Sequence, residues 1–228
     1  MRRRLRRGYV ALALMMATVG LFTLTMLSPV LSTTTDFSIY NSGWNGTSSL
    51  AKSTYELGNF APTLATQATG TDVTIVHLGL QELDMVASTD TLMIIGPSKP
   101  FSSSDGSVVR DFVSEGGILV LADDFGTGNG LLEAIGASSR FSGKLLMDLS
   151  FDKRPEFSVC FNFAEDDPLT TDLSKVLLNH PSSLTVAGAN STVVAESSIA
   201  SWLDSDGDSI RDVGEPRGPF PIMAREDL

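Results

Sequence analysis

One stretch, residues 116–136 (GGILVLADDFGTGNGLLEAIG), constrains the fold of this chain more than any other segment. Its apolar run, Ile118–Ala122, is typical of a strand buried on both faces, and the acidic, glycine-rich turn that follows opens a helix. In α/β proteins, ligands and catalytic groups sit at such a junction, at the carboxyl end of a parallel strand. The stretch therefore predicts an α/β core and the position of a functional site.

The preceding segment completes a strand–helix–strand unit. Thr91–Ile95 predicts a strand that stops at Gly96, and Ser104 with Asp105 predicts the start of a helix that ends at Gly116. Two apolar strands joined through a helix favour a right-handed crossover and a parallel sheet.

Further elements are predicted on both sides of this unit. A helix is expected at Ser48–Leu57, and strands are expected at residues 37–40, 72–78, 144–148, 157–161, 175–178 and 192–195. The acidic and proline-containing connections of the later strands indicate a mixed or antiparallel extension of the parallel core. The final PIMAREDL predicts no finishing strand, so the natural chain is expected to continue or to lack its last strand here.

The N-terminal residues predict a membrane anchor. Five arginines stand in the first seven residues, and residues 8–31 are uncharged. As a helix these would span about 36 Å, enough for a hydrocarbon core of about 30 Å. Because the basic residues lie only on the N-terminal side, that side is expected in the cytoplasm. A cleaved signal peptide is the alternative.

The expected organisation is therefore a single-pass protein of the cell membrane. It has a cytoplasmic tail (1–7), a transmembrane anchor (8–31), a linker (32–36) and an extracytoplasmic domain (37–228). Without the first 31 residues, five of the 16 basic residues are lost and all 27 acidic ones remain, so 11 positive charges face 27 negative ones, a formal −16. Such a charge argues against a nucleic-acid partner.

The acidic turn, residues 123–130, is the first candidate site. Its predicted ligand-binding residues are Asp123, Asp124, Thr127 and Asn129, which could hold a cation or a polar ligand. The glycine spacing matches neither a dinucleotide fingerprint nor, without the other kinase motifs, a kinase metal triplet. A hydrolase site built from Asp124, Thr127 and His77 is an alternative. In a purely structural alternative, Asp123 or Asp124 accepts the amides of the turn and caps the helix.

The second candidate site is the loop from Asp204 to Glu215, which resembles the calcium loops of extracellular thrombospondin type 3 and dockerin-like modules. Oxygen ligands stand at the spacing of a Ca²⁺ loop. The predicted metal ligands are Asp204, Asp206, Asp208, the Ile210 carbonyl, Asp212 and Glu215. The loop departs from the pattern at Ser209, where glycine usually allows a sharp bend. The alternative is a polar hairpin with solvated acids. Structural Ca²⁺ is the one cofactor expected.

With only Cys160 present, no internal disulfide can form, and its place in FSVCFNF predicts a buried apolar position.

These residues also resemble a known family, domain of unknown function 4350 of archaeal type. The likeness rests on residues 116–133, on NHPSSL at 179–184 and on residues 202–224. It implies a non-catalytic fold similar to class I glutamine amidotransferases, a flavodoxin-like α/β three-layer sandwich with a mostly parallel sheet. It also implies genes beside MoxR-type ATPases, and hence a partner in a membrane complex. The Gly-x-Cys-x-Gly elbow of true amidotransferases is absent, so no catalytic residue is carried over.

Three functions follow as expectations. The first is a membrane-anchored extracytoplasmic domain that binds a ligand or partner, or serves as a scaffold, without catalysis. The second is a cell-envelope hydrolase or transferase that uses the acidic turn. The third is a calcium-stabilised surface or adhesion module.

Overall fold

The computed structural model describes residues 15–19, 34–57, 79–85 and 90–228, and divides the chain into two compact units, residues 1–75 and 76–228. In the first unit, helix α2 (Ser48–Leu57) has the predicted bounds. The predicted strand at residues 37–40 is wrong, because turns occupy this segment. The buried Asn41 explains the difference: its side chain accepts the Gly43 N–H (2.8 Å) and donates to the Thr35 carbonyl (3.0 Å). Such local bonds to the backbone favour turns over an extended strand.

The predicted membrane anchor requires a correction. Most of residues 8–31 lies outside the described residues, and what is described there is a helical stretch at 15–19. Across the described ranges, no helix has the length and apolarity needed to cross a membrane. This finding contradicts the predicted single-pass topology and the cell-membrane localisation that depended on it.

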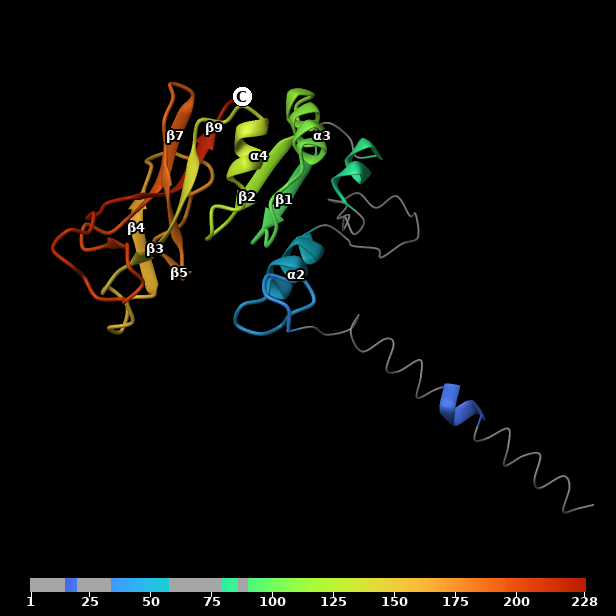
Figure 1. The fold of residues 1–228 in the computed structure, drawn as a ribbon, viewed down its shortest axis with the longest axis horizontal. Helices are drawn as coiled ribbons and strands as arrows, with labels where there is room; N and C mark the ends of the chain where they lie inside the picture. Colours follow the sequence, from blue (N-terminus) through green and yellow to red (C-terminus); the bar gives the residue numbers. More distant parts are fainter. Residues whose placement is uncertain (1–14, 20–33, 58–78, 86–89) are drawn as a thin grey trace, which may run out of the picture. The chain divides into compact units, whose positions relative to one another are not determined.

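A parallel strand pair with two helices forms the first part of the second unit (Figure 1). Strand β1 (Thr91–Ile95) pairs with β2 (Ile118–Ala122) in parallel, joined by α3 (Ser103–Ser114). Helix α4 (Asn129–Ala134) follows β2, and the 3-10 helix η1 (Leu80–Met85) precedes β1. The two strands and the crossover helix are as predicted, whereas the predicted strand at 72–78 lies outside the described residues.

Helix α3 begins two residues earlier than the sequence suggested, at a capping box with Ser102 as its N-cap. Ser102 accepts the Asp105 N–H, and the Asp105 side chain accepts the Ser102 N–H at 2.9 Å. Such reciprocal bonds satisfy two of the N–H groups that a helix leaves unpaired at its start. On its inner face α3 buries Val109 and Phe112 against Leu131 of α4 and the strands, forming the core of this part.

The outer face of the strand pair departs from expectation. Met93, Ile118 and Val120 are 46%, 57% and 40% exposed, although the apolar run predicted a strand buried on both faces. Leu92 and Leu119 point the other way and pack in the core. Among the described residues, helices cover one face only.

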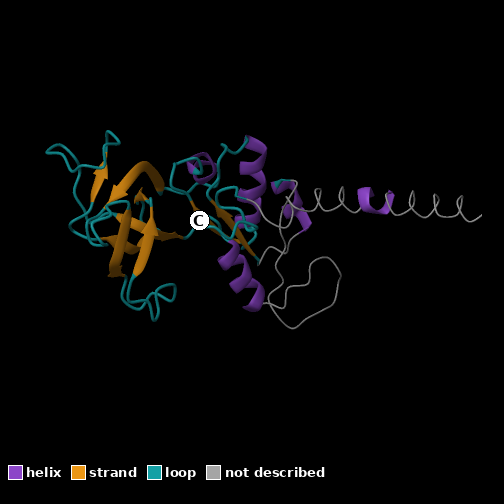
Figure 2. Cartoon of the chain, turned by 90° about the horizontal axis from the view of Figure 1, so that it is seen from below, coloured by secondary structure: helices purple, strands orange, loops and turns teal. Residues whose placement is uncertain are grey.

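The rest of the unit consists of two antiparallel sheets without helices (Figure 2). Their strands are β3 (Arg140–Met147), β4 (Phe157–Phe163), β5 (Val176–Asn179), β6 (Ser182–Thr185), β7 (Ser191–Ser197), β8 (Trp202–Asp204) and β9 (Pro221–Glu226). One sheet has the order β6-β3-β8 and the other β5-β4-β7-β9, and β6 contacts β9, so that the sheets curl into a half-barrel.

The predicted flavodoxin-like three-layer sandwich is therefore wrong. Only β1 and β2 are parallel among the described strands, and the seven others pair antiparallel. PIMARE, which predicted no strand, forms β9 on the edge of the four-stranded sheet. The predicted burial of Cys160 is confirmed, in a core that includes Val159, Val194 and Trp202. Burial also raises the pKa of its thiol, although backbone hydrogen bonds at Asn162 and Glu196 oppose the shift.

Candidate functional site

Asp123 stabilises the acidic turn through hydrogen bonds with the backbone of the turn itself. It directly follows β2 and is buried, and its two carboxylate oxygens accept the N–H of Phe125 (2.8 Å) and of Gly128 (2.6 Å). Gly128 is the N-cap of α4, so one carboxylate fixes both the bend and the start of the helix. Both oxygens are used in this way, which matches the structural interpretation of the turn for Asp123.

Asn129 joins the turn to β3. Its amide oxygen accepts the Phe141 N–H (2.8 Å), and its amide nitrogen donates to the Phe141 carbonyl (2.9 Å), so the side chain pairs with the strand as another backbone would. The strand and the turn approach closely here. A Cβ on Gly143 would lie 3.0 Å from the Phe125 carbonyl oxygen, and the φ of Gly143 is +64°. Asn129 is thus occupied in holding the fold.

The segment 179–183 contacts the same part of β3 from its other side. The Gly143 N–H donates to the Ser182 hydroxyl (3.0 Å), which lies 3.1 Å from the Ser142 hydroxyl, and Ser183 donates to Ser142 (2.9 Å). Ser182 and Ser183 are buried. Three segments therefore meet: the acidic turn, the irregular middle of β3 and the 179–182 turn that leads into β6.

Asp124 lies where these segments meet, and its environment differs from that of Asp123. Burial and the charge of Asp123 raise the pKa of Asp124 to about 6, against the opposing effects of the His180 charge and of a backbone hydrogen bond from Ser182. A carboxyl group with a raised pKa and a named charged neighbour is typical of functional sites, although structural networks also produce it. Next to it, Phe125 is 65% exposed.

His180 is held by contacts on several sides. Its N–H donates to the Glu156 carbonyl (2.8 Å), and its Nδ1 lies 2.7 Å from the Asn179 amide oxygen. The ring meets Phe157 edge-on, with centroids 6.2 Å apart. The guanidinium of Arg154 covers the same Phe157 ring at 4.7 Å from its centroid. His180 has a φ of +50°, a conformation that costs energy for a non-glycine residue and is found more often at functional sites.

The predicted site residues thus separate into two groups. Asp123 and Asn129 hold the turn, Asp124 is the one whose carboxylate faces other segments, and Thr127 is half-buried in the turn. His77, the predicted base of the hydrolase alternative, lies outside the described residues. The sequence reasoning missed His180 and Ser182, although it noted their NHPSSL segment as a family motif.

The second candidate site is built around Asp204, which ends β8 and is buried. Its carboxylate accepts the N–H of Gly207 (2.7 Å) and of Ser209 (3.0 Å). Ser209 has a φ of +62°, so it adopts the left-handed bend for which calcium loops usually use glycine. The departure seen in the sequence therefore does not change the path of the backbone.

The predicted metal ligands are brought together only in part. Carboxylate oxygens of Asp204, Asp206 and Asp208 lie within 4.8 Å of one another. The Asp208 amide lowers the pKa of Asp206, but burial and the charges of Asp208, Asp212 and Asp204 raise it overall. Glu215 accepts the N–H of Ser205 (2.7 Å) and of Asp212 (3.1 Å), which closes the loop. Ile210 and Asp212 are exposed, outside this group of three.

Comparison with known proteins places the chain in a family. The family model described as "Domain of unknown function (DUF4350)" matches residues 39–226. The chain belongs to the DUF4350 family. Both candidate sites lie within the region that the DUF4350 model matches, and the predicted anchor at 8–31 lies before it.

A protein similar to this DUF4350 chain is the "Uncharacterized protein in nifH1 5'region" of Methanothermococcus thermolithotrophicus. The two are 30% identical over 105 residues, which cover 46% of this chain and 92% of that protein. No solved structure matches the chain.

Proposed function

We propose that this DUF4350 chain is a binding domain without catalysis, and that its ligand or partner binds where the acidic turn meets the 179–182 turn. The arrangement around Asp124 carries the proposal. The partly buried carboxylate of Asp124 is next in the chain to the exposed Phe125, and the charge of His180 acts to lower its pKa. An aromatic side chain with a few convergent polar groups is the composition that binding sites share.

The hydroxyl groups at this place favour binding over catalysis. A nucleophile needs a base within hydrogen-bond reach. In the described part of the chain, Ser182 and Ser183 are buried and bonded to Ser142 or Gly143, and no hydrogen bond joins a hydroxyl to His180.

Photo-crosslinking tests the proposal. Benzoylphenylalanine in place of Phe125 should capture a discrete species in the native host, whereas the same group in place of the exposed Ile199 should not. Combining it with Asp124→Asn and His180→Gln should reduce the yield at least several-fold. Proteins encoded beside MoxR-type ATPases are the partners to look for first, on the family resemblance. Equal capture at both positions would contradict the proposed surface. A hydrolytic turnover that Asp124→Asn abolishes in a folded chain would contradict the absence of catalysis.

A second candidate function is a calcium-stabilised surface module, centred on the loop 204–215. The specific observation in its favour is that three carboxylates approach one another around the buried Asp204, in a loop that has the backbone bend of a calcium loop. Bringing these charges together costs energy unless a cation compensates them. Asp204, Asp206 and Asp208 would be its ligands.

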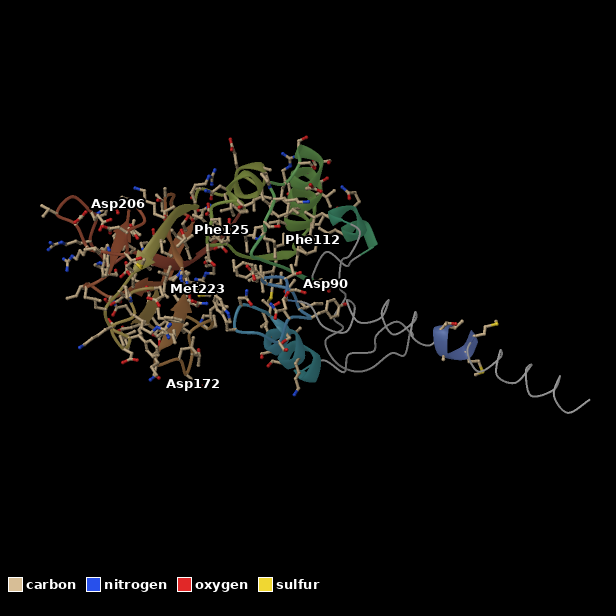
Figure 3. The ribbon with its side chains drawn as sticks, turned by 60° about the horizontal axis from the view of Figure 1, so that its bottom comes forward. Asp90, Phe112, Phe125, Asp172, Asp206 and Met223 are labelled. Carbon is tan, nitrogen blue, oxygen red and sulfur yellow. The ribbon has the colours of Figure 1, made fainter. Side chains whose placement is uncertain are left out.

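Thermal unfolding with calcium and with EDTA tests this second function. A ligand that binds only the folded state, at 100 times its Kd, stabilises it by about 2.7 kcal/mol, so calcium should raise Tm by several degrees. Asp206→Asn should remove most of that increase. Asp172→Asn is the matched control, because Asp172 is an exposed aspartate on another loop, away from Asp206 (Figure 3). An identical Tm in calcium and EDTA would rule the site out.

A further inference from the structure

Arg154 presents an oriented cationic group at the surface of the β3–β4 connection. Its guanidinium carbon lies 4.7 Å from the centroid of the Phe157 ring, and its Nε donates to the Glu156 carboxylate at 3.3 Å. The side chain is 58% exposed, and in the described part of the chain neither of its terminal Nη groups has a hydrogen-bond partner. Stacking and the Nε bond therefore fix the plane of the guanidinium and leave its terminal N–H donors free for an oxyanion.

The surroundings of Arg154 have the composition of a protein interface. Leu149 and Phe151 of the same connection are 59% and 39% exposed, and the centroid of the Phe151 ring lies 5.9 Å from that of Phe157. Lys153 adds a second exposed cation next to Arg154. Aromatic side chains and arginine are enriched at protein interfaces, whereas phosphate sites are commonly built from several converging backbone N–H groups.

The backbone of this connection is strained beside Arg154. Asp152 and Lys153 have φ values of +45° and +56°, so two successive residues with side chains adopt the left-handed conformation. The turn is closed by the N–H of Arg154, which donates to the Phe151 carbonyl at 2.8 Å. Strain of this kind persists only where the surrounding contacts enforce it, and it is common in segments that hold a ligand.

Phe157 joins this surface to the proposed binding site. Its ring is covered by Arg154 and meets the ring of His180 edge-on, and the His180 N–H donates to the Glu156 carbonyl at 2.8 Å. A partner that binds at Phe125 and His180 therefore has Arg154 within the continuation of the same surface.

We propose that the partner of this surface is a protein with an acidic segment, and that Arg154 binds a carboxylate of that segment. The proposal rests on the proposed function, because it names the partner of the same surface. The Nη groups of Arg154 donate two parallel hydrogen bonds to the carboxylate, and an apolar side chain of the partner packs on Leu149 and Phe151. A nucleic acid, with a charge on every nucleotide, is repelled by a chain with 27 acidic and 16 basic residues. A protein needs to present only a few carboxylates, at Lys153 and Arg154.

Crosslinking in the native host tests the proposal. Benzoylphenylalanine in place of Leu149 or of Phe151 should capture the same species as at Phe125, and mass spectrometry should find Asp or Glu close to the crosslinked position of the partner. Arg154→Gln should reduce the yield about tenfold, because the carboxylate loses two charge-assisted donors. Arg154→Lys keeps the charge without the planar fork, so it should restore only a small part. Arg110→Gln, at an exposed arginine of α3, is the matched control and should leave the yield unchanged.

Thermal unfolding of the same variants separates binding from folding. The Tm of Arg154→Gln should stay within a few degrees of the wild type, because an exposed ion pair contributes little to stability. If Arg154→Gln does not fold, Lys153→Glu makes the same test by reversing a charge at an exposed position, and should reduce the yield several-fold.

The inference is overturned if folded Arg154→Gln is captured as well as the wild type, or if the captured species is a nucleic acid, a lipid or a protein segment without acidic residues. Capture at Phe125 with none at Leu149 or Phe151 would also overturn it and leave the proposed function standing. Capture at Leu149 and Phe151 alone would instead reject the placement of the site at the acidic turn. An absence of capture at all three positions would reject both.

Discussion

At the scale of single residues, two neighbouring aspartates perform different tasks. Asp123 is buried and satisfied by two amides of its own turn, so it stabilises the fold. Asp124 reaches across to another segment and has a raised pKa. The sequence DD does not distinguish them, because the difference depends on which of the two carboxylates accepts the amides of the turn.

Replacing Asp123 by Ala should destabilise the chain by about 2–4 kcal/mol, because the N–H groups of Phe125 and Gly128 would lose their acceptor and stay desolvated. Urea unfolding at neutral pH measures the change. A loss below about 0.5 kcal/mol would show that water replaces the carboxylate.

At neutral pH, Asp124→Asn should not lower the free energy of unfolding, in contrast to Asp123→Ala. The folded pKa of about 6 lies above the usual value of 3.8 for an aspartate, so this group's contribution to stability is fully present below about pH 4 and is lost as pH rises through 6. The variant should therefore match the wild type near pH 4 and equal or exceed its stability at pH 7.5, as judged from urea midpoints. A variant that is less stable at pH 7.5 than at pH 4, relative to the wild type, would refute the sign.

At the scale of elements, local patterns were sufficient where neighbouring residues decide the structure. Helix α2 and strands β1 and β2 have the predicted bounds, because capping residues, apolar runs and glycines act within a few residues. The polar strand β6 (SSLT), the three-residue β8 and the edge strand β9 carry no such pattern. They are strands because partners elsewhere in the chain supply their hydrogen bonds.

Local patterns predicted only one side of the candidate site, the acidic turn. The glycines and aspartates of residues 123–130 indicate a turn after a strand, and that turn is present. The position of His180 depends on the pairing of β6 with β3, in which Phe141 lies opposite Leu184 and Leu145 opposite Ser182. No local sequence pattern contains this long-range register. The parallel sandwich was wrong because one strand–helix–strand unit was extended to the whole chain, although the acidic connections already indicated antiparallel strands.

The acidic loop offers a test of backbone conformation. Ser209 has a φ of +62°, so Ser209→Gly should stabilise the chain by about 0.4–1 kcal/mol by removing the strain of a side chain there. Gly207→Ala should destabilise it by about 1 kcal/mol, because the φ of Gly207 is +82°, a conformation that is unfavourable for alanine. A Cβ there meets no other atom within 4 Å, so no steric clash adds to this cost. Thermal unfolding in EDTA measures both without the effect of calcium. A Ser209→Gly variant that is less stable than the wild type, together with a Gly207→Ala variant that is more stable, would reject the loop geometry.

At the scale of the whole second unit, Glu226 of β9 connects the antiparallel sheets to the corner between α4 and β3. It accepts hydrogen bonds from the N–H and hydroxyl of both Ser138 and Ser139, at 2.6–3.1 Å. Burial alone would raise the pKa of Glu226, but these four bonds together lower it to about 2. The carboxylate therefore stabilises the unit only while it is ionised.

Acid should release this connection. Since the folded pKa of about 2 is below the usual 4.5, the contribution of Glu226 is present above about pH 4.5 and is lost as pH falls toward 2. Glu226→Gln should lower the urea midpoint at pH 7, and its deficit should shrink between pH 4.5 and 3. Asp227→Asn, which alters the next residue, an exposed aspartate, is the control. A deficit that is the same at both pH values would show that charge plays no part.

The same connection sets the order in which the chain can mature during synthesis. Ser138 and Glu226 are 88 residues apart, so a ribosome that adds about 5–20 residues per second needs roughly 4–18 seconds between them. The β1–α3–β2 unit is made of adjacent segments and can fold during that interval. The corner after α4 cannot, because its acceptor has not yet been synthesised. Nascent chains that stall before Glu226 should therefore expose a protease-sensitive site at Ser138 and Ser139, beside a parallel strand pair that is already protected.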